Sequence, residues 1–313
     1  MLITTIIYLH FSMVHNLKNI RRIINNERQP DPPHTEKRVA LILHGESSTS
    51  KKIIKGAQTT ATEENLKLTP FTVKPSGQLN LSDYYRLANL SDYDGIITGG
   101  NPRLIPLINK AAEEEIPTVT ILSDIADSRR ISYVGIDYYQ TGIITGNKLL
   151  RNFPDSSPRL AVVSTQNEED EYTPSSEYLK VFGFQVAAAA KTEAKIITWE
   201  KTGPTVLEAL QTVSRILENN PEINGLLTTG PELTLAAAQI LENEYPERDI
   251  ELIGFGNTES IREYVDKGII SASVIDSPKL IGSSAVREIN SYLENGSVNL
   301  YSNIDVDFLE GPE

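Results

Sequence analysis

Two stretches of the sequence carry oxygen-bearing side chains that could recognise a small polar molecule. Ser47, Thr49 and Ser50 lie beside a predicted helix start, where hydroxyls and backbone amides could donate hydrogen bonds to a hydroxyl-rich or anionic ligand. The same hydroxyls could simply cap that helix. Asp124 follows an apolar run, and a carboxylate accepts two hydroxyl hydrogens at once. Its alternative role is to cap the turn at 128–130.

Other side chains that could do chemistry are few. Trp199, the only tryptophan, offers either a stacking face for a ligand or ordinary packing. There is no cysteine, and all four histidines lie in the first 44 residues. This composition argues against zinc sites, thiolate catalysis, Fe–S clusters and disulfides. The sequence therefore favours binding over catalysis, and we predict no enzymatic activity, no metal and no cofactor.

The length and charge of the chain limit its architecture and its partners. Its 313 residues are enough for two domains. The formal net charge is −13, and nucleic-acid surfaces need clustered positive charge. We therefore expect no nucleic-acid partner.

The N-terminal segment differs from the rest of the chain. Residues 1–28 carry a local charge of +3, which leaves −16 for the remainder, and the first fourteen positions are apolar. Segment 1–27 is interpreted as a signal-like sequence, as a membrane anchor shortened by a late start codon, or as an amphipathic helix. Segment 28–36 contains three prolines and is predicted to be a linker.

After the linker, short apolar runs alternate with helix-sized segments. Continuous apolar strands that alternate with helices indicate parallel sheets covered on both faces, an α/β fold. The first helix is predicted over about 51–65, and the strands are predicted at 39–43, 93–98, 118–122, 160–163, 195–198, 225–228 and 251–255.

The pattern occurs twice, which predicts two copies of one doubly wound unit. Arg38-Val-Ala-Leu41 recurs as Arg159-Leu-Ala-Val162, Gly56-Ala-Gln58 as Gly183-Phe-Gln185, and the run from Asp94 as the run from Asn224. Ligands of such sheets bind beyond the carboxyl ends of the strands. The candidate loops are 44–50, 98–103 with Asn101, 122–130, 164–176, 199–204, 229–232, 256–258 and 276–278.

Three further stretches carry a family resemblance. The segment 116–142, Gly254-Phe-Gly-Asn-Thr258 and the segment 268–278 resemble the type I periplasmic binding protein family. This family includes ribose- and xylose-type solute-binding proteins and the effector domains of LacI-like repressors. The resemblance covers about 37–313. It implies two lobes joined by three crossovers, with lobe 1 formed by 37–136 plus 277–303 and lobe 2 by 137–276 plus 304–313.

The resemblance also implies where a ligand would bind. Asp124 stands where the second of two polar or acidic residues is usual, after a first acid that is lost, and no aromatic follows the first strand. Lys180 takes the place of an expected arginine. The remaining implied positions are Gly230 and Gly256 in place of Asn and Asp, with Glu232 and Asn257 nearby, and Asp276 at the second crossover. These departures argue against the usual pentose and hexose specificity.

The resemblance implies an extracytoplasmic solute-binding protein for a sugar or sugar derivative, with an ABC transporter permease or a sensor histidine kinase as its membrane partner. The N-terminus lacks a visible cleavage site and a lipobox cysteine, which favours a membrane-tethered sensor. The alternative is a LacI-type transcriptional regulator. That class needs a helix-turn-helix of about 60 residues ahead of the binding domain, and only 36 residues precede it here.

Overall fold

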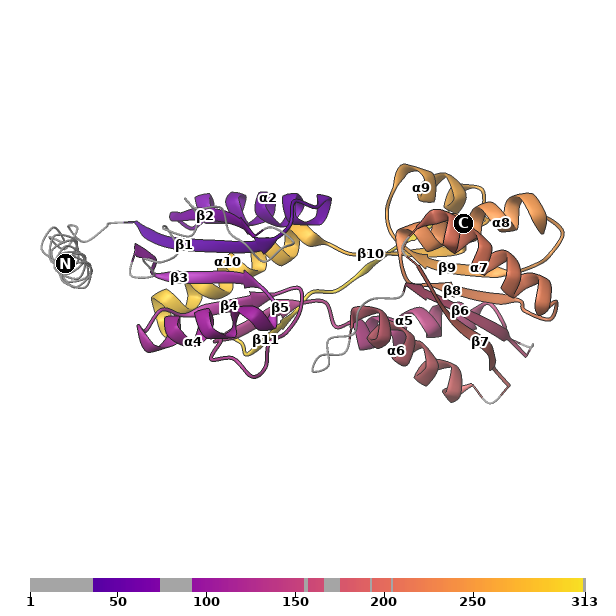
Figure 1. Cartoon of the computed structure of the whole chain (residues 1–313), viewed down its shortest axis with the longest axis horizontal. Coiled ribbons are helices and arrows are strands. Elements are labelled where there is room, and N and C mark those ends of the chain that lie inside the picture. The colour runs from indigo at the N-terminus through magenta and orange to yellow at the C-terminus, as the bar shows by residue number, and fades with distance from the viewer. Residues whose placement is uncertain are drawn as a thin grey trace, which may run out of the picture.

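The chain forms two α/β lobes that follow one another end to end along the long axis of the molecule (Figure 1). The structure is a computed structural model that describes residues 36–73, 92–154, 157–165, 175–191, 193–203 and 205–311. The segments assigned from sequence to an N-terminal anchor or signal (1–27) and most of the linker (28–36) lie outside the described residues. Within the described part, no helix combines the length and hydropathy needed to cross a bilayer.

Lobe 1 is built on a six-stranded sheet with the order β11-β5-β4-β3-β1-β2. Helices α2 and α10 pack on one face of this sheet, and α4 packs on the other. Its elements are β1 (Lys37–His44), α2 (Ser48–Glu63), β2 (Leu66–Val73), β3 (Gly95–Gly99), the 3-10 helix η2 (Pro102–Leu104), α4 (Ile105–Glu113), β4 (Thr118–Ile121), β5 (Ser132–Gly135), α10 (Pro278–Asn295) and β11 (Tyr301–Asn303).

Lobe 2 repeats this arrangement with the order β12-β10-β9-β8-β6-β7. Its last strand, β12, is antiparallel to β10, whereas β11 in lobe 1 is parallel to β5. Its elements are α5 (Tyr138–Arg151), β6 (Arg159–Thr165), α6 (Ser176–Ala190), β7 (Lys195–Thr202), α7 (Val206–Asn219), β8 (Gly225–Thr228), α8 (Pro231–Glu244), β9 (Glu251–Phe255), α9 (Glu259–Asp266), β10 (Ala272–Ile275) and β12 (Asp307–Glu310). The predicted fold class, two doubly wound parallel lobes, is confirmed.

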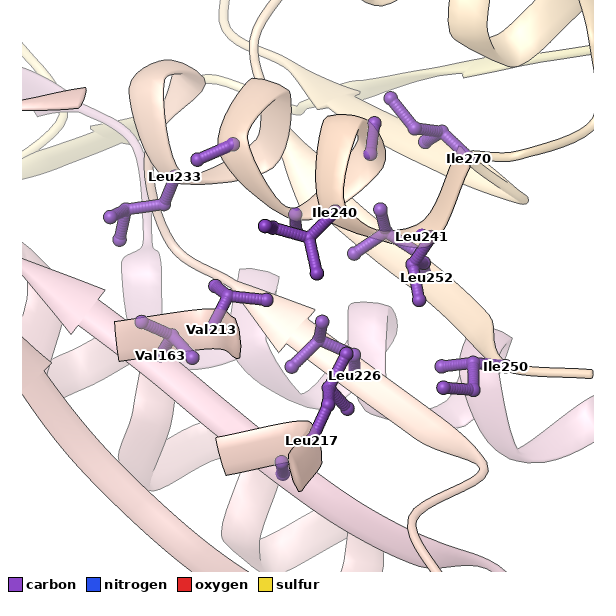
Figure 2. Close-up of a cluster of buried hydrophobic side chains, with 14 of the residues drawn as sticks. Val163, Val213, Leu217, Leu226, Leu233, Ile240, Leu241, Ile250, Leu252 and Ile270 are labelled. Atoms are coloured by element: carbon purple, nitrogen blue, oxygen red, sulfur yellow. The ribbon is translucent and has the colours of Figure 1, made fainter. Parts of the chain in front are cut away.

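Each sheet is buried on both faces, as the continuous apolar strands predict. In β1, Ala40 and Ile42 point to the cluster beneath α4, while Leu41 points to the cluster beneath α2 and α10. In lobe 2, the side chains of β6, β8 and β9 interlock with those of α7 and α8; Leu226 and Ile240 belong to this cluster (Figure 2). The strands of both sheets are thereby fixed by packing on both faces.

The duplication extends to one helix pair in each lobe. A Cβ on Gly56 of α2 would overlap the backbone of α10, and a Cβ on Gly282 of α10 would overlap the backbone of α2. Gly183 of α6 and Gly142 of α5 show the same reciprocal contact in lobe 2. Glycine permits this close approach because it has no Cβ. The two lobes therefore share one scaffold.

Three segments connect the lobes: β5 leads to α5, β10 leads to α10, and β11 leads to β12 (Figure 1). Asp137 caps the N-terminus of α5, because its Oδ1 accepts the Gln140 amide at 2.9 Å. Asp276 lies between β10 and α10. Crossings of this kind allow two lobes to move as rigid bodies.

Some strand predictions were incomplete. The strand β2 was not predicted because Pro70 and alternating polar residues interrupt its apolar pattern, and an edge strand tolerates both. The strand β5 was missed because Ser132, although buried, is polar. The strand predicted at 195–198 continues to Thr202, so the prediction that a loop begins at Trp199 is wrong.

Candidate ligand-binding cleft

Two cavities lie where the lobes meet. The interlobe cavity, of about 390 Å³, is lined by Gly100, Pro102, Leu122, Ser123, Asp124, Tyr133, Ile136, Asp137, Tyr138, Ser175, Ser176, Leu179, Tyr301 and Asn303. The lobe 2 cavity, of about 300 Å³, is lined by Ile136, Tyr138, Thr141, Thr165, Glu177, Lys180, Thr229, Gly230, Pro231, Glu232, Phe255, Gly256, Val274, Asp276 and Val306. Ile136 and Tyr138 line both. Cavities of this size hold small-molecule ligands.

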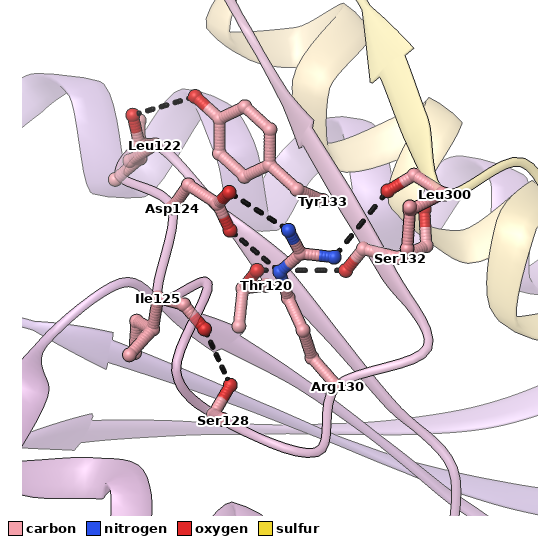
Figure 3. A network of polar contacts seen from close by, with 9 residues as sticks. All are labelled: Thr120, Leu122, Asp124, Ile125, Ser128, Arg130, Ser132, Tyr133 and Leu300. Carbon is pink, nitrogen blue, oxygen red and sulfur yellow. Dashed lines mark hydrogen bonds and ion pairs between the residues drawn. The ribbon is translucent and has the colours of Figure 1, made fainter.

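On the lobe 1 side, Asp124 is held by an arginine. The Arg130 Nε lies 2.5 Å from Asp124 Oδ1, and Nη2 lies 2.7 Å from Oδ2 (Figure 3). The Arg130 side chain is only 4% exposed, and its guanidinium lies over the ring of Tyr301. The structure thus shows Asp124 paired with the side chain of Arg130, the last residue of the turn at 128–130. A bidentate pair fixes the carboxylate in one orientation while each oxygen keeps accepting capacity.

The loop after β4 has an unusual backbone. Leu122 has φ +70°, a conformation that non-glycine residues rarely adopt, and the Tyr133 hydroxyl donates to its carbonyl at 3.1 Å (Figure 3). Burial is the main reason that the pKa of the Tyr133 phenol is raised, and Asp124 and Asp137 contribute to the same shift. Tyr133 therefore stays a neutral donor that holds this loop at the cavity wall.

On the lobe 2 side, Lys180 is a buried cation. Its Nζ donates to Glu177 Oε1 at 2.7 Å and to the Thr229 carbonyl at 2.9 Å. The rings of Phe255 and Tyr138 lie 4.6 Å and 5.2 Å from the ammonium. A buried charge needs this kind of compensation by an opposite charge, hydrogen bonds and ring faces.

Two polar atoms of this wall have no partner among the described residues. They are Glu177 Oε2 and Thr229 Oγ1, and both residues line the lobe 2 cavity. Burial, reinforced by the charges of Asp276 and Glu177, raises the pKa of Tyr138 to about 12. A buried polar atom without a hydrogen-bond partner is costly, which makes these two atoms candidates for contact with a ligand.

Four predicted site residues lie around the same cavity: Lys180, Gly230, Glu232 and Asp276. Gly230 is the N-cap of α8 and provides only backbone, while Glu232 lies in the first turn of that helix. Asn257 is exposed and follows Gly256, which lines the cavity with φ +121°. The structure thus places Lys180, Gly230, Glu232 and Asp276 around one cavity, whereas Asn257 is outside the described lining of both cavities.

The predicted lobe 1 hydroxyls lie elsewhere. The described lining of the two cavities does not include Ser47, Thr49 or Ser50. Ser47 caps α2, because its Oγ accepts the Ser50 amide at 3.0 Å, and the two hydroxyls lie 2.9 Å apart. The Asn101 Oδ1 accepts a hydrogen bond from the Arg103 amide and so caps η2. Its neighbours Gly100 and Pro102 line the interlobe cavity, whereas Asn101 is outside the described lining.

Trp199 lies inside β7 rather than after it. Its indole Nε1 donates to Ser164 Oγ at 2.9 Å, and its ring lies 6.5 Å from that of Tyr178. The described lining of both cavities lacks Trp199. In this structure the indole packs β7 against α6.

Residues that the sequence analysis missed include Glu177, Tyr138 and Thr229. Glu177 could have been found, because glutamate three positions before Lys180 on a helix is placed to form an ion pair. Thr229 falls in a predicted loop but carried no distinguishing signal. No group of three or more His, Asp or Glu side chains is placed to hold a metal ion within the described residues.

Comparisons with known proteins identify the family to which this chain belongs. A curated relative, the D-apiose import binding protein of Paraburkholderia graminis, is 21% identical over 63% of this chain, and the match spans 62% of that protein's length. The solved structure of GanP, a glucose-galactose binding protein from Geobacillus stearothermophilus, is 26% identical with a TM-score of 0.70 and covers 88% of this chain and 97% of its own.

A third similar structure is that of the XylFII–LytSN complex, at 24% identity and a TM-score of 0.68, covering 88% of this chain and 98% of its own. The family model described as a periplasmic binding protein domain matches residues 39–297, which include most of both lobes and most of the residues that line the two cavities. The resemblance predicted from sequence is confirmed, and the chain belongs to the periplasmic binding protein family.

Proposed function

We propose that this chain is an extracytoplasmic solute-binding protein that closes its lobes on a sugar or sugar derivative. The observation that carries the proposal is the lobe 2 cavity, in which Glu177 Oε2 and Thr229 Oγ1 are buried without partners. Hydroxyl groups of a polyol are matched donors for such atoms. The names of an apiose import protein and a glucose-galactose binding protein among its relatives support this ligand class.

Binding would couple to closure because the interlobe cavity is shared. Asp124 and Asn303 line it from lobe 1, while Ser175 and Leu179 line it from lobe 2. A ligand that contacts both walls binds the closed arrangement better than the open one, so it shifts the population toward closure. The crossings at Asp137 and Asp276 would absorb the rotation.

A membrane partner, either an ABC transporter permease or a sensor histidine kinase, would bind the closed form. The import function in a relative's name supports the first, and the solved complex of XylFII with LytSN supports a protein partner for this fold. Fractionation of cells that express the tagged full chain tests the location. Recovery outside the cytoplasm supports the proposal, and a cytosolic pool bound to DNA contradicts it.

The ligand class is tested by thermal shift and calorimetry of the full chain with pentoses, hexoses, inositols and sugar phosphates. A bound sugar raises the unfolding midpoint in proportion to the logarithm of its excess over the dissociation constant. Glu177→Gln should weaken the response, while Glu259→Gln, an exposed glutamate on α9 outside the lining of both cavities, should leave it intact. No response to any sugar would contradict the proposal.

A further inference from the structure

The lobe 2 cavity carries more negative than positive charge. Three carboxylates line it, on Glu177, Glu232 and Asp276, against the single ammonium of Lys180. The formal sum is therefore three negative charges and one positive charge, or −2. Glu177 is nearly buried, whereas Glu232 and Asp276 are exposed, so the two surplus carboxylates are accessible from solvent.

Lys180 does not neutralise the surplus. Its ammonium is already engaged by Glu177 Oε1 and the Thr229 carbonyl, and its residue is only 8% exposed. Glu232 and Asp276 are exposed to solvent, and neither forms an ion pair or a side-chain hydrogen bond with another described residue. Two carboxylates of this cavity thus lack a counter-charge from the part of the protein that the structure describes.

The adjoining interlobe cavity does not supply that charge. Its described lining contains no lysine or arginine, and Arg130, which lies next to it, is committed to Asp124 through two hydrogen bonds. Asp137 lines the same cavity and adds a further carboxylate. The raised pKa of Tyr138 agrees with a negative potential here, because Asp276 and Glu177 both contribute to that shift in addition to burial.

We propose, on the basis of the proposed function, that the preferred ligand is a polyhydroxylated amine, such as a hexosamine, rather than a neutral or anionic sugar. Its hydroxyls donate to Glu177 Oε2 and Thr229 Oγ1, which are the buried atoms without partners. Its ammonium lies on the side of Glu232 and Asp276. The same field opposes a phosphate or carboxylate on the ligand.

Calorimetry of the full chain with matched sugars tests this. The pairs are D-glucosamine with D-glucose, D-galactosamine with D-galactose and D-mannosamine with D-mannose, and the N-acetyl forms provide amides without charge. At least one amino sugar should bind about tenfold more tightly than its neutral and N-acetyl counterparts, and the preference should shrink as salt screens the charges.

The double substitution Glu232→Gln with Asp276→Asn assigns the preference to this cavity. It should reduce the ratio of amino-sugar to neutral-sugar affinity by about tenfold while it changes neutral-sugar affinity much less. Glu259→Gln is the matched control, because Glu259 is also an exposed first-turn glutamate of a lobe 2 helix and lines neither cavity.

The outcomes separate this inference from the proposed function. If neutral sugars bind as tightly as their amino counterparts, or sugar phosphates bind best, the inference is overturned and the proposed function stands. If the double variant keeps the full preference, the assignment to Glu232 and Asp276 is wrong. If none of the sugars binds, both the inference and the proposed function are contradicted.

Discussion

The two sides of the cleft use the same kind of charged pair in different surroundings. In lobe 1, Asp124 and Arg130 form a bidentate pair in which the carboxylate is 25% exposed. In lobe 2, Lys180 and Glu177 form a single contact, and their side chains are 9% and 12% exposed. One oxygen of Glu177 has no partner among the described residues.

This difference suggests that the two walls of the cleft have different roles in ligand binding, although the two lobes have the same fold. The lobe 1 wall is largely satisfied before any ligand arrives, so it provides shape and a fixed carboxylate. The lobe 2 wall keeps unmet hydrogen-bonding capacity at Glu177 and Thr229. We therefore expect most polar contacts of a ligand to come from lobe 2.

The largest expected effect is on Lys180. Lys180→Met leaves Glu177 buried without its cation and should lower the free energy of unfolding by about 3–5 kcal/mol. Arg130→Met should lower the free energy of unfolding by less, about 1–3 kcal/mol, because water reaches the Asp124 carboxylate. Urea unfolding followed by circular dichroism measures both. Lys267→Met, which removes an exposed pair with Glu242, is the control and should change little. If Arg130→Met lowers the free energy of unfolding as much as Lys180→Met or more, the proposed difference between the two walls is contradicted.

We expect the closely packed helix pairs of the two lobes to be equally sensitive to substitution of their glycines. Gly142→Ala and Gly282→Ala each place a Cβ against the backbone of the paired helix. Each should lower the free energy of unfolding by about 1–3 kcal/mol despite the better helix propensity of alanine. Denaturant titration measures the two losses. A loss in one lobe alone would show that the helix pairs are not equivalent.

Two neighbouring threonines distinguish a binding role from a structural one. Thr229→Val removes a hydroxyl without a partner among the described residues, so stability should stay equal or rise by up to about 1 kcal/mol while sugar affinity falls about tenfold. In Thr228→Val the lost hydroxyl bonds Thr234, so stability should fall by about 1 kcal/mol. Thermal unfolding and calorimetry report both effects. Unchanged sugar affinity in Thr229→Val would exclude Thr229 from the binding wall.

The smallest expected effect is on Trp199. Because its indole bonds Ser164 and packs on α6, Trp199→Phe should change sugar affinity less than about twofold and cost about 1 kcal/mol of stability. Calorimetry with the sugar panel measures the affinity. A loss of affinity beyond tenfold would instead place the indole against the ligand.

The sequence predicted the repeated architecture because its signals are local. Buried parallel strands read as apolar runs, and the recurrence of Gly56 as Gly183 marks equivalent positions in two helix pairs. The edge strand β2 and the polar strand β5 lacked that signal.

The site was less predictable, because its geometry depends on side chains that meet only in the folded chain. The position of Lys180 followed from the resemblance, but its contact with the Thr229 carbonyl joins two elements 49 residues apart. The hydroxyls of Ser47 and Ser50 could bind a ligand or cap a helix, and only the structure shows that they cap α2. Residue type gives the chemistry available, and packing determines how it is used.

Hydrogen–deuterium exchange of the full chain, with and without the tightest-binding sugar of the panel, tests the central claim most directly. Amides that become ordered by a ligand exchange more slowly. The account predicts that protection increases at 229–232, at the start of α6 and, to a smaller extent, at 122–124. Protection confined to α7 and the C-terminal half of α8, or no change while calorimetry shows binding, would contradict a ligand bound between the lobes.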